Sequence, residues 1–265
     1  MNGRETVAIK HGASVSEEYN HIGINQAKTN NHGRQHYNLR QAGFDTIEIA
    51  SGAVVEGKEK MRRLRLRIEE FSEEELAIAG TAGQIRHWEM ACEPYGIAIG
   101  QVLATHEEID DTAEGTHIIN NIKSATSKGM LVVLNENNAE AIKELVEYEQ
   151  GQEARKRGEG DSEADNDWLA AHTAISVGAS SLLLLTNKHG FEVDDEVVPE
   201  IKVADIPDML QYCGDPSESG TGGMDSKLLA AGKAAEAGIN VILGNAFVDC
   251  RALLAGDLVC SRVVQ

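Results

Sequence analysis

The stretch Thr6-Val7-Ala8-Ile9-Lys10-His11-Gly12-Ala13-Ser14 contains the pattern on which the rest of this chain is built. Residues 6–10 are a short apolar run that ends in a lysine, and they predict a β-strand that breaks directly into a turn of small residues. The same pattern recurs where residues 46–50 run into Ser51-Gly52-Ala53, and where residues 131–134 run into Asn135-Glu136-Asn137. Short strands of this kind, alternating with helical stretches, indicate βα units.

The repeated unit predicts an α/β fold with a mainly parallel sheet, in one large domain or two closely joined lobes. The predicted strands are residues 6–10, 46–50, 96–103, 131–134, 181–186 and 240–243. The predicted helices are residues 24–41, 73–93, 139–149, 166–177 and 226–237, the first of them weakened by its asparagines and a glycine. Residues 150–164 are charged and predict a mobile surface loop. Ligands of open parallel sheets bind beyond the carboxyl ends of the strands, so the strand-end turns predict one shared crevice.

Composition excludes some classes of function. The chain has 265 residues, 42% of them hydrophobic, and a formal net charge of −19. Such an acidic chain repels nucleic-acid backbones and anionic membrane surfaces, so we expect no nucleic-acid partner and no membrane partner. A nucleotide ligand would require a few lysines and backbone N–H groups to create a local positive site.

The remaining composition favours a reducing, cytoplasmic compartment. The four cysteines are far apart and form no CxxC pair, so neither a zinc site nor a disulfide framework is predicted. His32 and His36 are spaced i, i+4, but in an asparagine-rich stretch we expect them to be solvated, and no metal site is predicted. The N-terminus has no apolar signal region, and no apolar run is long enough to span a bilayer.

The run Gly220-Thr221-Gly222-Gly223-Met224-Asp225-Ser226-Lys227 has the composition of a phosphate site. Glycines let backbone N–H groups approach an anion closely, because no Cβ intervenes. Asp225 or Ser226 is expected to cap the following helix, whose N-terminus adds partial positive charge, and Lys227 adds a full charge. The alternative is a flexible turn before a helix. The run matches neither the Walker pattern nor GxGxxG after a strand.

Polar groups at other strand ends are candidates for the same crevice. Lys10 precedes Gly12, and a fixed lysine there would stabilise a phosphoryl group in transfer; the alternative is a solvated strand-end lysine. Ser51-Gly52-Ala53 offers N–H groups and a hydroxyl. Asn135-Glu136-Asn137-Asn138 and Asp165-Asn166-Asp167 cluster groups that would hold an amino group, Mg²⁺ or the lysines, although Asn and Asp are also common in turns and caps.

Taken together, these motifs resemble the amino-acid kinase family, and within it the glutamate 5-kinase branch. The resemblance covers nearly the whole chain in order and spacing. The motifs that carry it are Lys10-His11-Gly12-Ala13-Ser14, Ala50-Ser51-Gly52-Ala53-Val54 with Gly57, Gly83-Gln84, Tyr95-Gly96, Gly100-Gln101-Val102-Leu103, Asn135-Glu136-Asn137, Asp165-Asn166-Asp167, residues 182–186 with Gly190, and the glycine-rich run ending at Lys227.

The resemblance implies a three-layer αβα sandwich in a single kinase domain, with a substrate lobe at residues 1–175 and a nucleotide lobe at residues 176–265. It implies phosphorylation of L-glutamate by ATP with Mg²⁺, the first step of proline synthesis. By matching position, the catalytic residues would be Lys10, Lys227 and Asp167, with the aspartate orienting both lysines. The implied substrate-binding residues are Ser51, Gly52, Ala53, Asn137, Asn138 and Asn166. The implied nucleotide-binding residues are Gly12, Thr186, Asn187, Gly220, Thr221, Gly222, Gly223, Met224 and Lys227.

The chain departs from the family pattern at three of these positions. Asn138, Ala164 and Asn187 stand where the family motifs have Asp, Gly and Asp, and the segment 138–165 is longer than usual. Two alternatives therefore stay open: a kinase for another small acid or a phosphate ester, and a weakly catalytic nucleotide- or metabolite-binding regulator. The resemblance also implies a possible homo-oligomer and a possible glutamyl phosphate reductase partner, and no appended PUA domain is expected.

Overall fold

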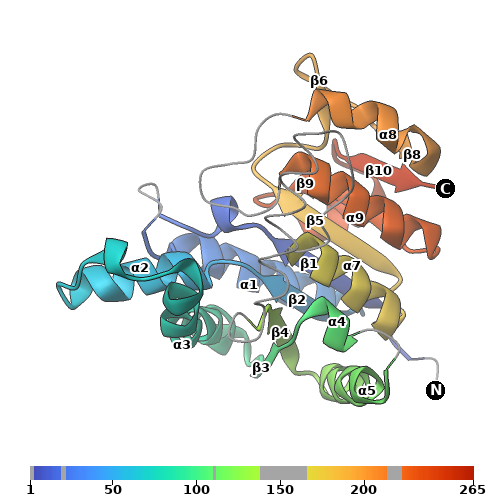
Figure 1. The fold of residues 1–265 in the computed structure, drawn as a ribbon. Coiled ribbons are helices and arrows are strands. Elements are labelled where there is room, and N and C mark those ends of the chain that lie inside the picture. The colour runs from blue at the N-terminus through green and yellow to red at the C-terminus, as the bar shows by residue number, and fades with distance from the viewer. Residues whose placement is uncertain (1–2, 19–21, 110–111, 138–165, 214–222) are drawn as a thin grey trace.

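A computed structural model describes residues 3–18, 22–109, 112–137, 166–213 and 223–265 (Figure 1). An eight-stranded sheet runs through the centre in the order β3-β4-β2-β1-β5-β9-β10-β8. In that order the strands are Ile99–Leu103, Leu131–Asn135, Asp45–Ala50, Thr6–His11, Ser181–Thr186, Asn240–Asn245, Ser261–Val264 and Glu200–Lys202. Only β10 pairs antiparallel, with β9, and the other neighbours are parallel. A small separate hairpin joins β6 (Glu192–Val193) to β7 (Glu196–Val197).

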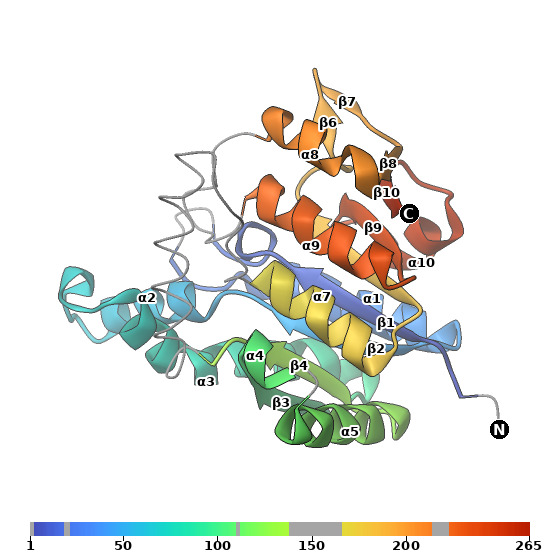
Figure 2. The same cartoon turned by 45° about the vertical axis from the view of Figure 1, so that its right-hand side comes forward.

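Helices cover both faces of this sheet, as Figures 1 and 2 show, so the predicted three-layer αβα architecture is confirmed. The helices on the front face are α4 (His106–Ile109), α5 (Ala113–Ser127), α7 (Asn166–Val177), α8 (Ile206–Met209) and α9 (Met224–Glu236). Those on the back face are α1 (Gln26–Gln41), α3 (Glu73–Cys92) and α10 (Cys250–Ala255). The helix α2 (Ala53–Arg63) packs on α3 and extends away from the sheet.

The central strands are buried on both faces. In β5, Leu182 and Leu184 pack into the front core while Leu183 and Leu185 pack into the back core. A strand covered by helices on both sides reads as a continuous apolar run, which is why residues 181–186 were easy to identify from the sequence. The six predicted strands are all present, β5 with its predicted bounds and the other five with shifted ends, and β6, β7, β8 and β10 were not predicted.

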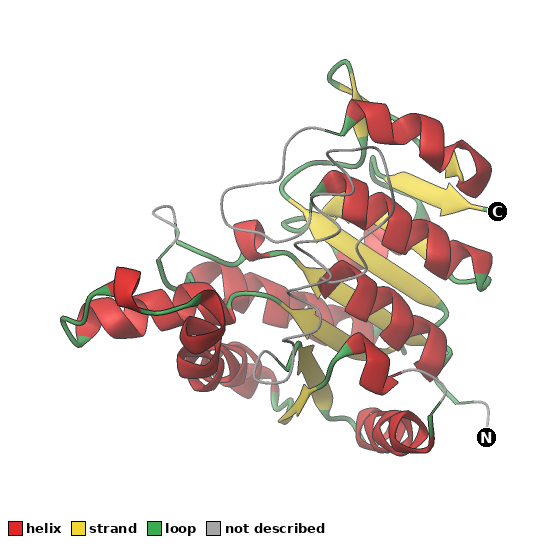
Figure 3. Cartoon of the chain, in the orientation of Figure 1, coloured by secondary structure: helices red, strands yellow, loops and turns green. Residues whose placement is uncertain are grey.

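The helix α1 illustrates how packing overrides a weak local pattern. Gly33 is one of the residues that weaken the predicted helix, along with the asparagines, and a Cβ at this position would lie 2.7 Å from the carbonyl oxygen of Ala91. The glycine therefore permits the close contact between α1 and α3 that stabilises both helices. Figure 3 shows α1 as one continuous helix behind the sheet.

Several expectations about helices need correction or lie outside the described residues. The predicted helix 139–149 and loop 150–164 fall in a segment that the structure does not describe. The helices α2, α4, α5, α8 and α10 were not predicted. The helix α9 begins at Met224 with Gly223 as its N-cap, so neither Asp225 nor Ser226 caps it. Among the described helices, none has the length and apolarity needed to cross a bilayer.

Candidate functional site

Three charged side chains from different elements meet at the carboxyl edge of the sheet. Lys10 lies at the end of β1, Asp167 in the first turn of α7 and Lys227 in the first turn of α9. The Nζ atom of Lys10 lies 2.8 Å from Oδ1 of Asp167, and the Nζ atom of Lys227 lies 2.7 and 2.9 Å from its two oxygens. The side chains are only 8%, 1% and 9% exposed, so this charge triad is shielded from bulk water.

The triad carries one excess positive charge, because Asp167 stays ionised. Burial raises the pKa of Asp167, but the ammonium groups of Lys10 and Lys227 outweigh that effect and bring the pKa to about 2. Two lysines and one aspartate then leave a net charge of +1 at the edge of a chain with a net charge of −19. A buried positive site in an acidic protein is suited to a small anion.

Helix dipoles make one part of the triad costly. An acidic residue in the first turn of α7 is favourable, because the helix N-terminus carries partial positive charge. Lys227 occupies the same place in α9, where a cation is unfavourable. Positive charge from two helix N-termini and from Lys227 is concentrated at one point. This arrangement lowers the stability of the fold, but it suits the binding of a phosphate group.

The turn after β2 lies beside this triad. Gly52 is the N-cap of α2 and has φ +114°, a conformation that favours glycine, and a Cβ there would meet Ile24 at 3.3 Å. The Nδ2 atom of Asn166, at the start of α7, donates to Oγ of Ser51 at 3.5 Å. The Oδ1 atom of Asn166 is buried and has no hydrogen-bond partner among the described residues. Ala53 is buried in the first turn of α2.

Other predicted residues lie at neighbouring strand ends. Gly12 follows β1, and a Cβ at this position would lie 3.9 Å from Nζ of Lys10, so its backbone borders the triad. Thr186 ends β5, and its hydroxyl donates to Oδ1 of Asn187 at 3.1 Å. Asn137 follows β4 and is partly buried. Asn138 and the glycine-rich residues Gly220, Thr221 and Gly222 lie outside the described residues.

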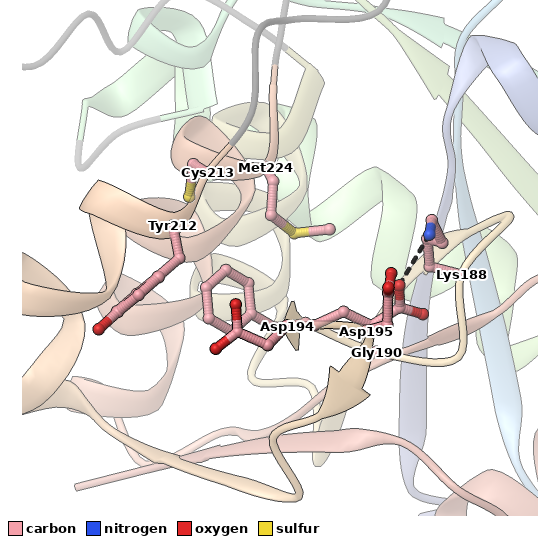
Figure 4. A pocket seen from close by; sticks show the side chains of 9 residues that line it. Lys188, Gly190, Asp194, Asp195, Tyr212, Cys213 and Met224 are labelled. Carbon is pink, nitrogen blue, oxygen red and sulfur yellow. Dashed lines mark hydrogen bonds and ion pairs between the residues drawn. The ribbon is translucent and has the colours of Figure 1, made fainter.

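A cavity of about 360 Å³ opens beside the first residue of α9, as Figure 4 shows. Its lining residues are Lys188, Gly190, Phe191, Glu192, Asp194, Asp195, Tyr212, Cys213 and Met224. Lys188 is held by Glu192 at 2.7 Å. Only Met224 of this group was predicted as a site residue. The others come from the loop between β5 and β6, from the β6–β7 hairpin and from the segment after α8. Of these, only Gly190 belongs to a motif of the sequence analysis.

The prediction that two histidines are exposed to solvent was wrong. His32 and His36 were expected to be solvated, because the sequence around them is polar, but both are fully buried under the back face of the sheet. Their partners come from distant segments: Nε2 of His36 lies 3.0 Å from Oε2 of Glu48 in β2. Sequence spacing alone gave no sign of Glu48, which lies between Ile47 and Ile49 in β2.

Comparisons with known proteins agree with this architecture. The chain belongs to the amino acid kinase family, whose model matches residues 2–245. It is 32% identical over 246 residues to a glutamate 5-kinase of Vibrio campbellii, covering 90% of this chain and 60% of that protein. It is 34% identical over 250 residues to a glutamate 5-kinase of Sodalis glossinidius, covering 92% and 64%. The chain thus spans about three fifths of the length of these relatives.

Solved structures share the fold at low sequence identity. Carbamate kinase from Giardia lamblia bound to AMP-PNP matches with a TM-score of 0.69 at 15% identity, and each chain is covered completely. UMP kinase from Ureaplasma parvum matches with a TM-score of 0.63 at 15% identity, with 99% of this chain and 100% of that chain covered. The mainly parallel eight-stranded sheet is therefore the fold of amino-acid kinases.

Proposed function

We propose that this chain is an ATP-dependent kinase that phosphorylates the side-chain carboxylate of L-glutamate, giving L-glutamyl 5-phosphate. This is the first step of proline synthesis. The observation that carries the proposal is the buried triad of Lys10, Asp167 and Lys227, with contacts of 2.7–2.9 Å. Relatives named glutamate 5-kinase, at about one third identity, support the choice of acceptor.

The described residues fit the phosphate groups of ATP. The triad supplies an excess positive charge, and the backbone at Gly12 leaves room beside Nζ of Lys10. Lys10, Lys227 and Gly12 would receive the phosphate oxygens, with the predicted residues Gly220–Gly223 completing the cradle. Met224, Tyr212 and Phe191 in the adjoining cavity would contact the nucleoside. Thr186 and Asn187, at the end of β5, are the remaining predicted nucleotide contacts. Mg²⁺ would be held chiefly by the phosphates and would neutralise part of their charge.

In this proposal each residue of the triad has its own task. Lys10 and Lys227 place two ammonium groups where negative charge spreads over the equatorial oxygens of the transferring phosphoryl group. Asp167 holds both ammonium groups in position before the ligands arrive, so little reorganisation is needed during the reaction. Shielding from water strengthens these interactions.

The glutamate side of the site is assigned to the turn after β2 and the start of α7. The Oδ1 atom of Asn166 is buried and unpartnered among the described residues, and a substrate ammonium group would satisfy it. Ser51 and the N–H groups of Gly52 and Ala53 would bind carboxylate oxygens. Asn137 and Asn138 are the remaining predicted contacts.

The direct test is ADP release that depends on glutamate, measured with Mg-ATP. We expect Lys10→Ala and Lys227→Ala to lower kcat by at least about 100-fold, the scale of a lost charge contact in a transition state. Lys233→Ala is the matched control, because Lys233 is an exposed lysine in the last turn of the same helix as Lys227. Purified protein without any glutamate-dependent turnover would exclude the proposed acceptor.

A second candidate keeps the kinase and changes the acceptor. Asn138 stands where the family motif has an aspartate that should pair with the substrate ammonium, and the structural neighbours act, by their names, on carbamate and UMP. A panel of small acids and phosphate esters at fixed ATP separates the two. Improved glutamate use by Asn138→Asp would favour glutamate, and ATP binding without transfer to any acceptor would favour a binding protein.

A further inference from the structure

A buried polar network lies on the back face of the sheet, behind Lys10. The carboxylate of Glu48 in β2 lies 2.9 and 3.0 Å from Nδ1 of His11 in β1, and 3.0 Å from Nε2 of His36 in α1. All three residues are 0% exposed. The ring of His11 stacks on His32 at 3.8 Å, and Nε2 of His32 lies 3.0 Å from the carbonyl oxygen of Val15.

Hydrogen bonding assigns the protons of this network. A carbonyl oxygen only accepts, so His32 carries its hydrogen on Nε2. If Glu48 is ionised, it accepts from Nδ1 of His11 and Nε2 of His36, and each of these N–H groups has a partner. The ring nitrogens left over, Nε2 of His11 and Nδ1 of His32 and of His36, are then bare acceptors without partners among the described residues.

A protonated Glu48 would be less well satisfied. If its carboxyl group donated to His11 or His36, that ring would carry its hydrogen on the far nitrogen, where no described residue accepts it. A buried donor without an acceptor costs the full desolvation of the group. The geometry therefore favours one buried negative charge, clamped by two neutral imidazoles.

This charge balances the charge triad across the sheet. Side chains alternate along a strand, so Lys10 faces α7 and α9 while His11, the next residue, faces α1. The triad in front has a net charge of +1, and Glu48 behind contributes −1. Helices cover both sites, so the two charges interact through protein rather than through bulk water.

We propose that Glu48, clamped by His11 and His36, is a positioning residue whose buried negative charge keeps Lys10 in its ammonium form. The role of Lys10 in phosphoryl transfer rests on the proposed function, but its charge state does not. The direction of the coupling agrees: burial raises the pKa of Glu48 to about 7, while His36, His11 and the Lys10 ammonium oppose that rise. Since coupling is reciprocal, ionised Glu48 raises the pKa of Lys10.

The titratable groups around Glu48 come from every element packed on this face. They are His11 in β1, His32, His36 and Arg40 in α1, Cys92 in α3 and Cys250 in α10. Burial lowers the pKa of His11 to about 3 and that of His36, and it raises the pKa of Cys92 and of Cys250 to about 12. The histidines and cysteines of this group are therefore neutral near pH 7, which leaves Glu48 and Arg40 as its charged members, with Lys28, Asp45 and Arg4 acting from the edge of the same face.

A transition-metal ion is the competing occupant, because His11, His36 and Glu48 bring three ligand atoms within 4.8 Å of one another. Two features weigh against it. Metal-bound imidazoles usually donate their other N–H to an acceptor, and neither far nitrogen has one among the described residues. A dication would also lie behind a triad that is already positive.

The test measures the pKa of Lys10 directly. The pH dependence of amine labelling at Lys10, followed by mass spectrometry of its peptide, reports this pKa without any assay of activity. In Glu48→Gln we expect the labelling midpoint to fall by about one pH unit, the order for one unit charge acting across an effective dielectric near 20. If the enzyme is active, the alkaline limb of its kcat/KM profile moves to lower pH by the same amount, because Lys10 loses its proton earlier.

Controls separate charge from packing. Ile9→Val removes a methylene from the same face of β1 and should lower Tm without moving either midpoint. If Glu48→Gln does not fold, the apolar triple variant His11→Leu, His36→Leu, Glu48→Leu carries the same test, since buried ionic groups often tolerate hydrophobic replacement. An unchanged labelling midpoint overturns the proposal, as does stoichiometric zinc in wild-type protein that Glu48→Gln lacks. A shifted midpoint in a protein without kinase activity would overturn only the proposed function.

Discussion

Replacing Asp167 by Asn tests the central contact of the triad. The substitution keeps the shape of the side chain and removes its charge, so the ammonium groups of Lys10 and Lys227 lose the carboxylate that they share. Both are within 2.9 Å of the present carboxylate and at most 9% exposed. Removing one partner of a buried ion pair is strongly destabilising, and here two ammonium groups lose the same partner.

The size of the loss follows from the pKa of Asp167. Burial raises this pKa and the two lysines lower it more strongly, so it lies at about 2, against an ordinary value of 3.8 for an aspartate. That displacement corresponds to about 2 kcal/mol of stability. Because the folded-state pKa is lowered, this contribution is fully present above the unfolded value and is lost as the pH falls through about 2. With lysine repulsion added, we expect Asp167→Asn to cost about 2–4 kcal/mol at pH 7.

The assay is urea unfolding at pH 7, monitored by circular dichroism, together with glutamate-dependent ADP release. Asp249→Asn is the matched control, because Asp249 makes a solvent-exposed ion pair with Arg251 at 2.6 Å. Exposed pairs contribute about 0–1 kcal/mol, and asparagine still caps the helix α10. A variant at Asp167 that is no less stable than the control, or that retains full kcat, would refute the reasoning.

Three further predictions concern packing, the cavity and the thiols. Gly80→Ala should lower the free energy of unfolding in urea by more than about 3 kcal/mol, because its Cβ would lie 1.9 Å from a backbone oxygen of α2. Gly43→Ala is the control: its Cβ would meet no atom within 4 Å, so it should cost only backbone strain, about 1–2 kcal/mol. Tyr212→Ala should raise the KM for ATP several-fold with little change in kcat, because the ring lines the cavity and not the triad; an unchanged KM would remove the nucleoside from this cavity. Burial raises the pKa of the Cys92 thiol to about 12, so native protein should react with a thiol reagent at Cys92 only after unfolding, and rapid labelling at pH 8 would contradict its burial.

Local sequence patterns predicted the central strands and the helix α7. The apolar runs of β1 and β5 are recognisable because strands between two helical layers carry little but aliphatic side chains. The helix α7 was predicted with its observed bounds, and its start places Asp167 at the strand ends. Since parallel strands end at one edge, the same pattern predicted that Lys10 and Lys227 share a crevice.

The cavity beside α9 could not be predicted from local sequence patterns. Its walls come largely from the loop between β5 and β6, from the β6–β7 hairpin, whose strands have two residues each, and from the short turns after α8. Elements of this size have no periodicity to detect, and their position depends on contacts with the rest of the fold. Tyr212 and Phe191 were therefore not predicted as site residues, although Phe191 follows Gly190 and Tyr212 precedes the glycine-rich run.

The buried histidines were missed for a different physical reason. A polar side chain is exposed unless a hydrogen-bond partner is buried with it, and here the partner lies in another segment of the chain. Glu48 is 37 residues from His11 and 12 from His36. His11 and Lys10 are adjacent in sequence, yet they face opposite layers, and one carboxylate in β2 links them electrostatically. In the proposed function, Lys10 has to stay charged at a nearly dry site. Its contact in front, Asp167, is shared with Lys227, and a phosphate acts on Lys10 only while it is bound. A fixed negative charge behind the strand acts at every stage, which is a physical reason to keep a carboxylate where an aliphatic side chain would pack more simply.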